Sequence, residues 1–325
     1  MQKLFKNVKQ LKNIDSNEWK QSDIVADFDE ICANFAVDEF DGFVVIPSFK
    51  NHFLNLLNLS SSQIEERIFA NIKAGVTDFI VLTDNFLVCK YLFEKFHLDG
   101  KIALMPDFDF DSIDYSSDKI LVYVDPYTME ENVLDEASDI AAKKGYKVVI
   151  RLFDNLEQTG ILNSNTGQLP ISYIESFGLL DRGGYISGAI CSDKEDYRIL
   201  SGYEFSIITR PIADLRKGNG FANIVQICNA ELGLSVGSDD EEDMNMFSYM
   251  RTLMLGTRGL LCNENALTEE EAFKILANSN DKSFIVLDKQ FNSVKDIVNK
   301  ANNDKILMVV SNGKVIYFRG EENAN

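Results

Sequence analysis

Eight short apolar runs, rich in β-branched residues, recur along residues 43–239 and constrain the fold more than any other feature of the chain. The runs are Phe43–Phe49, Asp78–Asp84, Lys101–Phe108, Lys119–Pro126, Lys147–Phe153, Gly184–Cys191, Glu204–Pro211 and Gly233–Asp239. Continuous apolar runs of this length are typical of strands buried on both faces, as in a parallel sheet. Amphipathic segments lie between most of them, so the alternation predicts a (β/α)8 barrel or a doubly wound sheet. Eight units favour the α/β barrel of the TIM type.

Four patterns of Ser or Thr followed by Glu three residues later mark predicted helix starts. They are Ser62-x-x-Glu65, Ser192-x-x-Glu195, Ser238-x-x-Glu241 and Thr268-x-x-Glu271. In such a capping box the hydroxyl and the carboxylate each accept a hydrogen bond from a backbone N–H that the first turn leaves unpaired. The patterns therefore predict helices that begin just after each Ser or Thr.

The two ends of the chain differ from its middle. Residues 1–42 contain short strand-like pieces and no clear helix, and the last 40 residues contain two apolar runs separated by Asn312-Gly313. An Asn-Gly pair between apolar runs is a strong signal for a β-hairpin. We predict that residues 1–42 and 283–325 together form a small β-sandwich domain beside a barrel of residues 43–282.

The charge balance bears on which partners the chain can bind. It has 51 acidic and 32 basic residues, for a net charge of −19. Nucleic acids and anionic membrane surfaces attract basic patches, so we expect neither as a partner. The five cysteines are scattered without a C-x-x-C pair, and the first 13 residues lack the apolar stretch of a signal peptide. We therefore expect a cytoplasmic protein with reduced thiols and no membrane span.

Four stretches, in this order along the chain, are similar to segments of the amidohydrolase superfamily, in its deaminase and chlorohydrolase branch. They are Ile72–Leu82, Asp125–Asn155, Phe205–Arg251 and Val310–Gly320. The resemblance implies a metal-bearing (β/α)8 barrel flanked by a small discontinuous β-sandwich.

The resemblance also implies positions for metal ligands, and this chain holds other residues there. The family's His-x-His pair after the first strand falls on Pro47 and Phe49. The histidine of the fifth strand falls on Arg151 and that of the sixth on Gly188. Only the aspartate of the eighth strand is kept, as Asp239, the equivalent of a catalytic residue. We therefore expect a degenerate member that has lost its metal centre and needs no cofactor.

The chain contains only two histidines, His52 and His97. Neither has a second His, Cys or Glu beside it at ligand spacing, and a catalytic zinc site generally takes three protein ligands. We expect both histidines to be structural or at the surface. The acidic run 239–243 lacks the spacing of a calcium-binding loop and is typical of a first helical turn.

Polar residues at the ends of the predicted strands should line a pocket, because the carboxyl ends of barrel strands meet at one face. The predicted pocket residues are Arg151, Asp154, Thr209, Arg210, Asp125 and Tyr127. In one interpretation the two arginines bind an anionic group. In the other they replace the lost cation and pair with Asp239 and Asp154, because a buried carboxylate is costly unless it is neutralised. We favour the second interpretation.

The leading functional prediction is a pseudoenzyme: a catalytically inactive protein that binds a small molecule in the barrel mouth or serves as a partner protein. The alternative is a metal-independent hydrolase of non-peptide carbon–nitrogen bonds, like a deaminase. It would use Asp239 as general base and Arg151 to polarise the substrate.

A homodimer is also predicted. Four apolar side chains follow the second predicted strand, and exposed apolar patches usually mark interfaces; the alternative is that these side chains simply pack on the barrel. They are Phe86, Leu87, Tyr91 and Phe93.

Overall fold

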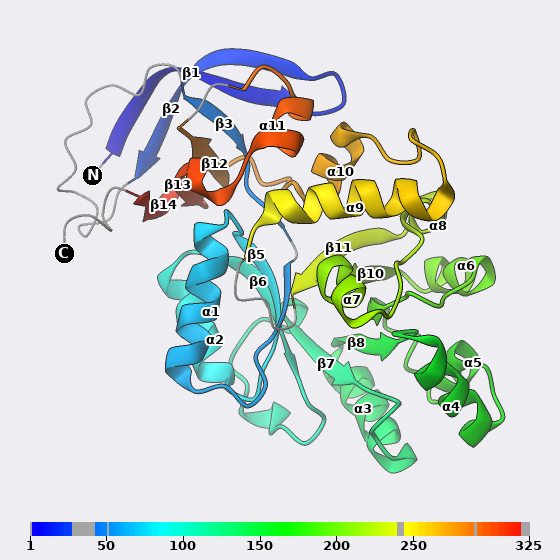
Figure 1. Ribbon diagram of the computed structural model, residues 1–325. Coiled ribbons are helices and arrows are strands. Elements are labelled where there is room, and N and C mark those ends of the chain that lie inside the picture. Colours follow the sequence, from blue (N-terminus) through cyan, green and yellow to red (C-terminus); the bar gives the residue numbers. More distant parts are fainter. Residues whose placement is uncertain (1, 28–42, 51, 239–243, 289–290, 320–325) are drawn as a thin grey trace.

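The structure is a computed structural model that describes residues 2–27, 43–50, 52–238, 244–288 and 291–319. Eight parallel strands form a closed barrel, as the sequence predicts (Figure 1). The ring closes where Gly237 of the last strand pairs with Phe53 of the first. In order around the barrel, the strands are β4 (His52–Asn55), β5 (Asp78–Leu82), β6 (Asp99–Leu104), β7 (Ile120–Val124), β8 (Lys147–Leu152), β9 (Gly184–Gly188), β10 (Phe205–Thr209) and β11 (Gly233–Ser238).

Helices surround the barrel. They are α1 (Ser61–Lys73), α2 (Phe86–Lys95), α3 (Glu131–Lys144), α4 (Leu156–Thr166), α5 (Pro170–Ser176), α6 (Lys194–Gly202), α7 (Pro211–Lys217), α8 (Ile224–Asn229), α9 (Met246–Leu261) and α10 (Glu269–Leu276). The predicted capping box of Thr268 and Glu271 is present at α10. Two others use neighbouring residues: Ser60 with Gln63 begins α1, and Asp193 with Asp196 begins α6. The fourth pattern, at 238–241, extends outside the described residues.

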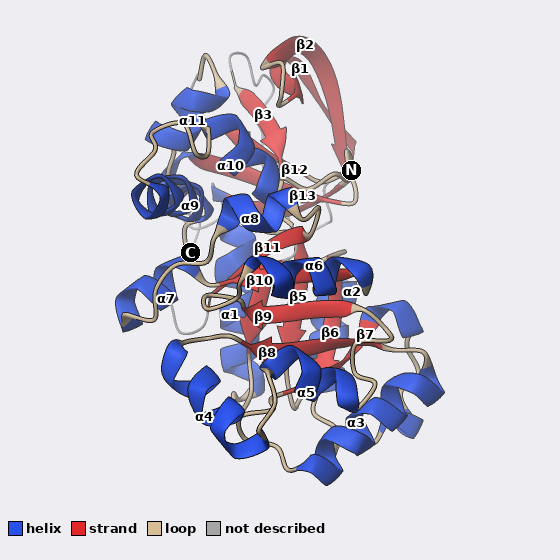
Figure 2. Ribbon diagram, turned by 90° about the vertical axis from the view of Figure 1, so that its right-hand side faces the viewer, coloured by secondary structure: helices blue, strands red, loops and turns tan. Residues whose placement is uncertain are grey.

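The two chain ends form a second, smaller sheet that closes on itself (Figure 2). Its strands are β1 (Gln2–Asn13), β2 (Glu18–Asp27), β14 (Lys314–Phe318), β13 (Ile306–Ser311), β12 (Phe284–Leu287) and β3 (Val44–Pro47), and the helix α11 (Val294–Lys300) joins β12 to β13. The predicted hairpin at Asn312-Gly313 joins β13 to β14, and both residues have positive φ, 48° and 81°. Positive φ at both central residues is what a two-residue hairpin turn requires.

The position predicted for the first strand of the large barrel was wrong. The run Phe43–Phe49 contributes β3, which pairs with β12 and β1 of the small sheet, and the first strand of the large barrel is β4. Pro47 ends β3, as expected for a residue that cannot donate to a ladder. The predicted domain boundary at residue 43 therefore moves past β3. The prediction failed because FVVIPSF is longer and richer in β-branched residues than HFLN.

The interior of the large barrel is filled by alternate residues of its strands. Their buried cluster consists of Phe53, Ile80, Leu82, Ala103, Leu121, Tyr123, Val149 and Ile208. The intervening residues, such as Leu54 and Val81, join the main core between the strands and the helices. Because side chains alternate across a strand, this assignment fixes which residues can face a site at the barrel mouth.

Candidate functional site

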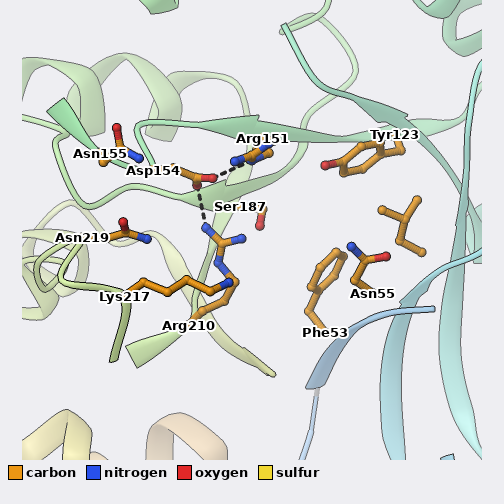
Figure 3. Close-up of a pocket in the computed structure, with 11 residues that line it drawn as sticks. Phe53, Asn55, Tyr123, Arg151, Asp154, Asn155, Ser187, Arg210, Lys217 and Asn219 are labelled. Atoms are coloured by element: carbon orange, nitrogen blue, oxygen red, sulfur yellow. Dashed lines mark hydrogen bonds and ion pairs between the residues drawn. The ribbon is translucent and has the colours of Figure 1, made fainter. Parts of the chain in front are cut away.

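A cavity of about 390 Å³ lies at the carboxyl ends of the barrel strands, where active sites of this fold are found (Figure 3). It is lined by Phe53, Asn55, Leu82, Tyr123, Arg151, Asp154, Asn155, Ser187, Arg210, Lys217 and Asn219. In Figure 3 the charged residues gather on one side and the two aromatic rings lie on the other. The cavity is therefore two-sided, with one polar and one apolar wall.

Arg151 of β8 is the centre of the polar wall. Its Nε donates to Asp154 Oδ2 at 2.5 Å and its Nη1 donates to Asp125 Oδ2 at 3.0 Å. Its Nη2 donates to Gln158 Oε1 at 3.3 Å, and the guanidinium carbon lies 5.6 Å from the centroid of the Tyr127 ring. Burial lowers the pKa of Arg151, but the two carboxylates outweigh burial and raise that pKa above its ordinary value. The guanidinium is a permanent cation with a fixed orientation.

Asp154 joins the two arginines of the site. Its side chain is almost completely buried, and its second oxygen, Oδ1, accepts from Nη2 of Arg210 at 2.6 Å. Behind Arg210, Asp214 Oδ1 lies 3.9 Å from the same nitrogen and accepts from Nδ2 of Asn219 at 3.1 Å. The prediction that the arginines pair with Asp154 is confirmed, whereas Asp239 lies outside the described residues.

The backbone around this cluster is strained. Phe153 and Ala189 adopt the left-handed conformation, with φ of 61° and 60°, which costs a non-glycine residue roughly 1 kcal/mol or more. The N–H of Phe153 donates to the hydroxyl of Tyr127 at 2.8 Å, which helps to hold this turn. At Gly188, a Cβ atom would lie 2.3 Å from Asp154 Oδ1, so the carboxylate occupies the space that a side chain there would need.

No family model matches the chain. One curated relative, the 5-methylthioadenosine/S-adenosylhomocysteine deaminase of Bacillus cytotoxicus, is 26% identical over 153 residues, which are 46% of this chain and 35% of the relative. The 5'-deoxyadenosine deaminase of Methanocaldococcus jannaschii is 24% identical over 162 residues, covering 49% of this chain and 39% of the relative. The chain thus matches well under half of the length of these two relatives.

Solved structures share the fold over nearly the whole chain. An adenosine deaminase from Xanthomonas campestris with bound zinc has a TM-score of 0.74 at 12% identity, covering 96% of this chain and 92% of that one. A guanine deaminase from C. acetobutylicum with bound guanine has a TM-score of 0.70 at 14% identity, covering 98% and 100%. A triazine hydrolase variant has a TM-score of 0.75 at 13% identity, covering 97% and 94%. The chain is similar in sequence to curated deaminases, and it shares the fold of solved deaminases and of a triazine hydrolase.

Because β4 is the first strand of the large barrel, the positions that correspond to the amidohydrolase His-x-His pair lie on β4. Phe53 and Asn55 of β4 face the cavity, and we assign the pair to them. Pro47 lies in the small sheet, and the ring of Phe49 packs edge-on against Phe247, 5.6 Å between centroids, in the main core. The assignment of the pair to Pro47 and Phe49 was therefore wrong.

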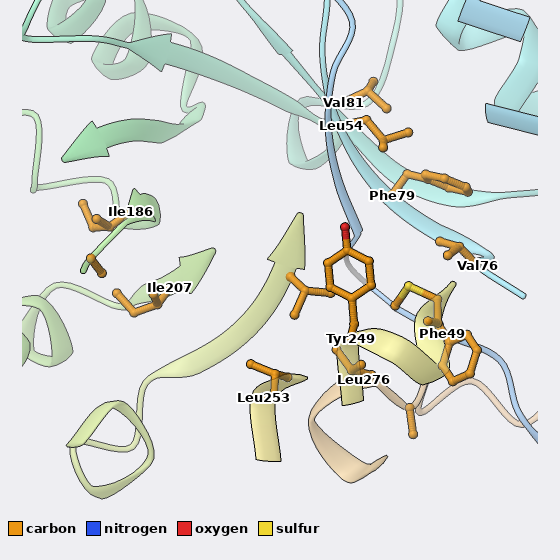
Figure 4. Close-up of a cluster of buried hydrophobic side chains, with 14 of the residues drawn as sticks. Phe49, Leu54, Val76, Phe79, Val81, Ile186, Ile207, Tyr249, Leu253 and Leu276 are labelled. Carbon is orange, nitrogen blue, oxygen red and sulfur yellow. The ribbon is translucent and has the colours of Figure 1, made fainter. Parts of the chain in front are cut away.

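His52 cannot take the place of a lost ligand. It precedes Phe53 on β4 and therefore points to the outside of the barrel, where its ring lies edge-on to Tyr249 at 5.7 Å (Figure 4 shows Tyr249 in this core). Its Nε2 lies 3.0 Å from the hydroxyl of Ser238, and complete burial lowers its pKa to about 3. His52 is thus a neutral core histidine, as predicted.

The residues at the amidohydrolase ligand positions do not fit a catalytic metal. Among the described residues at these positions, Phe53 and Gly188 offer no side-chain donor atom, Arg151 is a cation, and Asn55 supplies an amide oxygen, whereas Asp239 lies outside the described residues. Within the described part of the chain, no three His, Cys, Asp or Glu side chains converge as an ion would require. A catalytic zinc site generally takes three protein ligands and an open position.

The remaining predicted pocket residues, Asp125, Tyr127 and Thr209, lie near the cavity but do not line it. Asp125 and Tyr127 stand behind Arg151, and Thr209 is buried at the end of β10. The prediction missed several lining residues: Phe53, Asn55, Leu82, Tyr123, Asn155, Ser187, Lys217 and Asn219. Two of them lie close together in the sequence: Lys217 is the last residue of α7, and Asn219 follows it after the C-cap Gly218.

Proposed function

We propose that this protein is a catalytically silent amidohydrolase relative that binds a small molecule at the barrel mouth without a metal ion. The observation that carries the proposal is the guanidinium of Arg151, which occupies a metal-ligand position of the family and is held there by Asp125 and Asp154. A fixed cation at that point supplies the positive charge that the family obtains from its ion, so the carboxylates around it are neutralised.

The alternative, a metal-independent hydrolase, lacks an evident base among the described residues of the cavity. Both oxygens of Asp154 accept hydrogen bonds from guanidinium groups, and a carboxylate held in this way is a weak base. Arg151 remains protonated, so it could polarise a carbonyl but could not activate water. This second function is still tested because the two curated relatives are deaminases.

The test is an assay for ammonia release. Purified protein is incubated with 5-methylthioadenosine, S-adenosylhomocysteine, 5'-deoxyadenosine, adenosine and guanine, with and without added zinc. The proposal predicts a rate equal to that of the buffer blank for every compound. Turnover that is abolished by Asp239→Asn would contradict it and establish the hydrolase.

A further inference from the structure

We propose that Asn219, at the barrel mouth, is a site of spontaneous covalent modification, in which its side-chain amide is converted to a carboxylate through a cyclic imide formed with Gly220. The chain contains two Asn-Gly pairs, Asn219-Gly220 and Asn312-Gly313. Because glycine has no Cβ, the backbone nitrogen that follows each asparagine can approach the side chain with little steric hindrance. The surroundings of the two pairs differ, and they favour reaction at Asn219. The inference does not depend on the proposed function.

The reaction needs no reagent other than water. The backbone nitrogen of Gly220 loses its proton and attacks Cγ of Asn219, the bond from Cγ to Nδ2 breaks, and ammonia leaves with that proton. Water then opens either of the two imide C–N bonds, which gives aspartate or isoaspartate at position 219. The net change consumes one water and forms one ammonia and one carboxylate.

The atoms that would have to react at Asn312 are all held by hydrogen bonds. Its Nδ2 donates to the carbonyl oxygen of His97 at 2.9 Å, and its Oδ1 accepts from Nδ2 of Asn280 at 2.7 Å. The attacking nitrogen, that of Gly313, donates to the carbonyl oxygen of Lys282 at 2.8 Å. All three bonds must break before the nitrogen can reach Cγ, so the fold protects this pair.

The pair at the barrel mouth is held less firmly. Asn219 and Gly220 begin the irregular segment between α7 and α8, and Gly220 is exposed. Among the described residues, none accepts a hydrogen bond from the N–H of Gly220. The Asn219 amide donates from Nδ2 to Asp214 Oδ1 at 3.1 Å. The attacking nitrogen is therefore available, and one hydrogen bond to the departing Nδ2 must break.

The modification would change the barrel mouth, because Asn219 lines the cavity on the same side as Lys217 (Figure 3). The new carboxylate would take the place of an amide that donates to Asp214. Asp214 is almost completely buried and lies 3.9 Å from Nη2 of Arg210. Two carboxylates this close repel each other unless one of them takes up a proton. The modification therefore loosens the end of α7 where it meets the cavity.

The test compares the two Asn-Gly pairs within one sample. The full chain is incubated folded, at mildly alkaline pH, in water labelled with heavy oxygen, and is then digested with trypsin. Mass spectrometry follows the label in the peptides Gly218–Arg251 and Ile306–Lys314, with fragmentation to locate it. We expect Asn219 to take up label at least about tenfold faster than Asn312, because three hydrogen bonds protect Asn312 and one holds the Asn219 amide.

The same incubation in urea is the control for the fold. Unfolding removes the hydrogen bonds at both pairs, so the two rates should become equal. Equal rates in the folded chain, faster labelling of Asn312, or no labelling of Asn219 would overturn the inference. Asn219→Gln should stop labelling at position 219, because its imide ring would be larger, and should leave Asn312 unchanged.

Three further variants test the consequence at the mouth by urea denaturation. Asn219→Asp mimics the product and should lower the urea midpoint. Asp214→Asn combined with Asn219→Asp exchanges the amide and the carboxylate and should recover most of the loss. Asn265→Asp adds the same charge on an exposed turn and should leave the midpoint unchanged. Equal midpoints for Asn219→Asp and Asn265→Asp would contradict the repulsion from Asp214.

Discussion

At the scale of single residues, Gly188 shows how the site differs from that of its relatives. The position is assigned to a histidine in the family, but here its φ is 122° and Asp154 fills the space beside it. Gly188→Ala should therefore cost about 2–4 kcal/mol of unfolding free energy, from backbone strain and from the collision with Asp154. Urea denaturation measures this loss.

The matched control for that substitution is Gly145→Ala. Gly145 ends α3 with a φ of 71°, and nothing lies within 4 Å of the Cβ position. It should cost only about 1 kcal/mol, from the left-handed backbone alone. An equal loss at both glycines would show that Asp154 does not constrain position 188.

His52 gives a prediction about pH. Its pKa is about 3 in the folded protein because of burial, against an ordinary value near 6.5. The unfolded chain therefore binds a proton below pH 6.5 that the folded chain does not bind until pH 3, so stability is full above 6.5 and is lost as pH falls. Between pH 6.5 and 5 the loss from this group should be about 2 kcal/mol. His52→Gln should remove that slope.

The second histidine supplies the control for this experiment. His97 is exposed and has a φ of 50°, which asparagine tolerates, so His97→Asn should leave the pH dependence of unfolding as in the unsubstituted protein. If His52→Gln leaves the slope unchanged, burial of a neutral imidazole is not its cause.

At the scale of elements, the capping box at the start of α10 can be tested by substitution. The hydroxyl of Thr268 accepts from the N–H of Glu271 at 3.2 Å, and the Glu271 carboxylate accepts from the N–H of Thr268 at 2.7 Å. Thr268→Ala removes half of this box and should lower the unfolding free energy by about 1 kcal/mol, whereas Thr268→Ser should retain it. Thermal unfolding compares the two. Indistinguishable midpoints would show that the cap contributes nothing.

Most elements could be predicted from the sequence because the apolar runs are long and strong. Seven of the eight barrel strands lie within or overlap the predicted runs, and the capping residues lie within two positions of the predicted ones where described. The exception is β4, whose four residues, HFLN, carry little β signal. It forms because its neighbours β11 and β5 supply partners on both sides, which is information that no local pattern contains.

The error at β4 spread to the site, because a shift along the chain changes which residues face the interior. It placed the lost ligand pair on Pro47 and Phe49 instead of on Phe53 and Asn55. On β8 the strand was placed correctly, and the prediction that Arg151 and Asp154 pair was correct as well. Which residues meet across the barrel, such as Arg210 with Asp154, depends on strand order and could only be guessed.

At the scale of the whole molecule, the predicted homodimer stays a proposal. Of the four apolar side chains on which it rests, Phe86 and Phe93 are buried, whereas Leu87 and Tyr91 are 73% and 59% exposed on α2. No helix in the described residues is both long and apolar enough to cross a bilayer. If α2 is the interface, multi-angle light scattering should give twice the 36.7 kDa of one chain, and Leu87→Glu should reduce it to one chain. A mass of one chain at micromolar concentration would contradict the dimer.

In the proposed function, Arg151 supplies the cation of the barrel mouth in place of a metal. The most direct measurement is the metal content of the protein after incubation with zinc, iron and manganese followed by gel filtration, read by mass spectrometry of the elements. We predict well under one-tenth of an ion per chain, because three protein ligands are needed and the described positions offer one amide oxygen. One tightly held ion per chain would contradict the account.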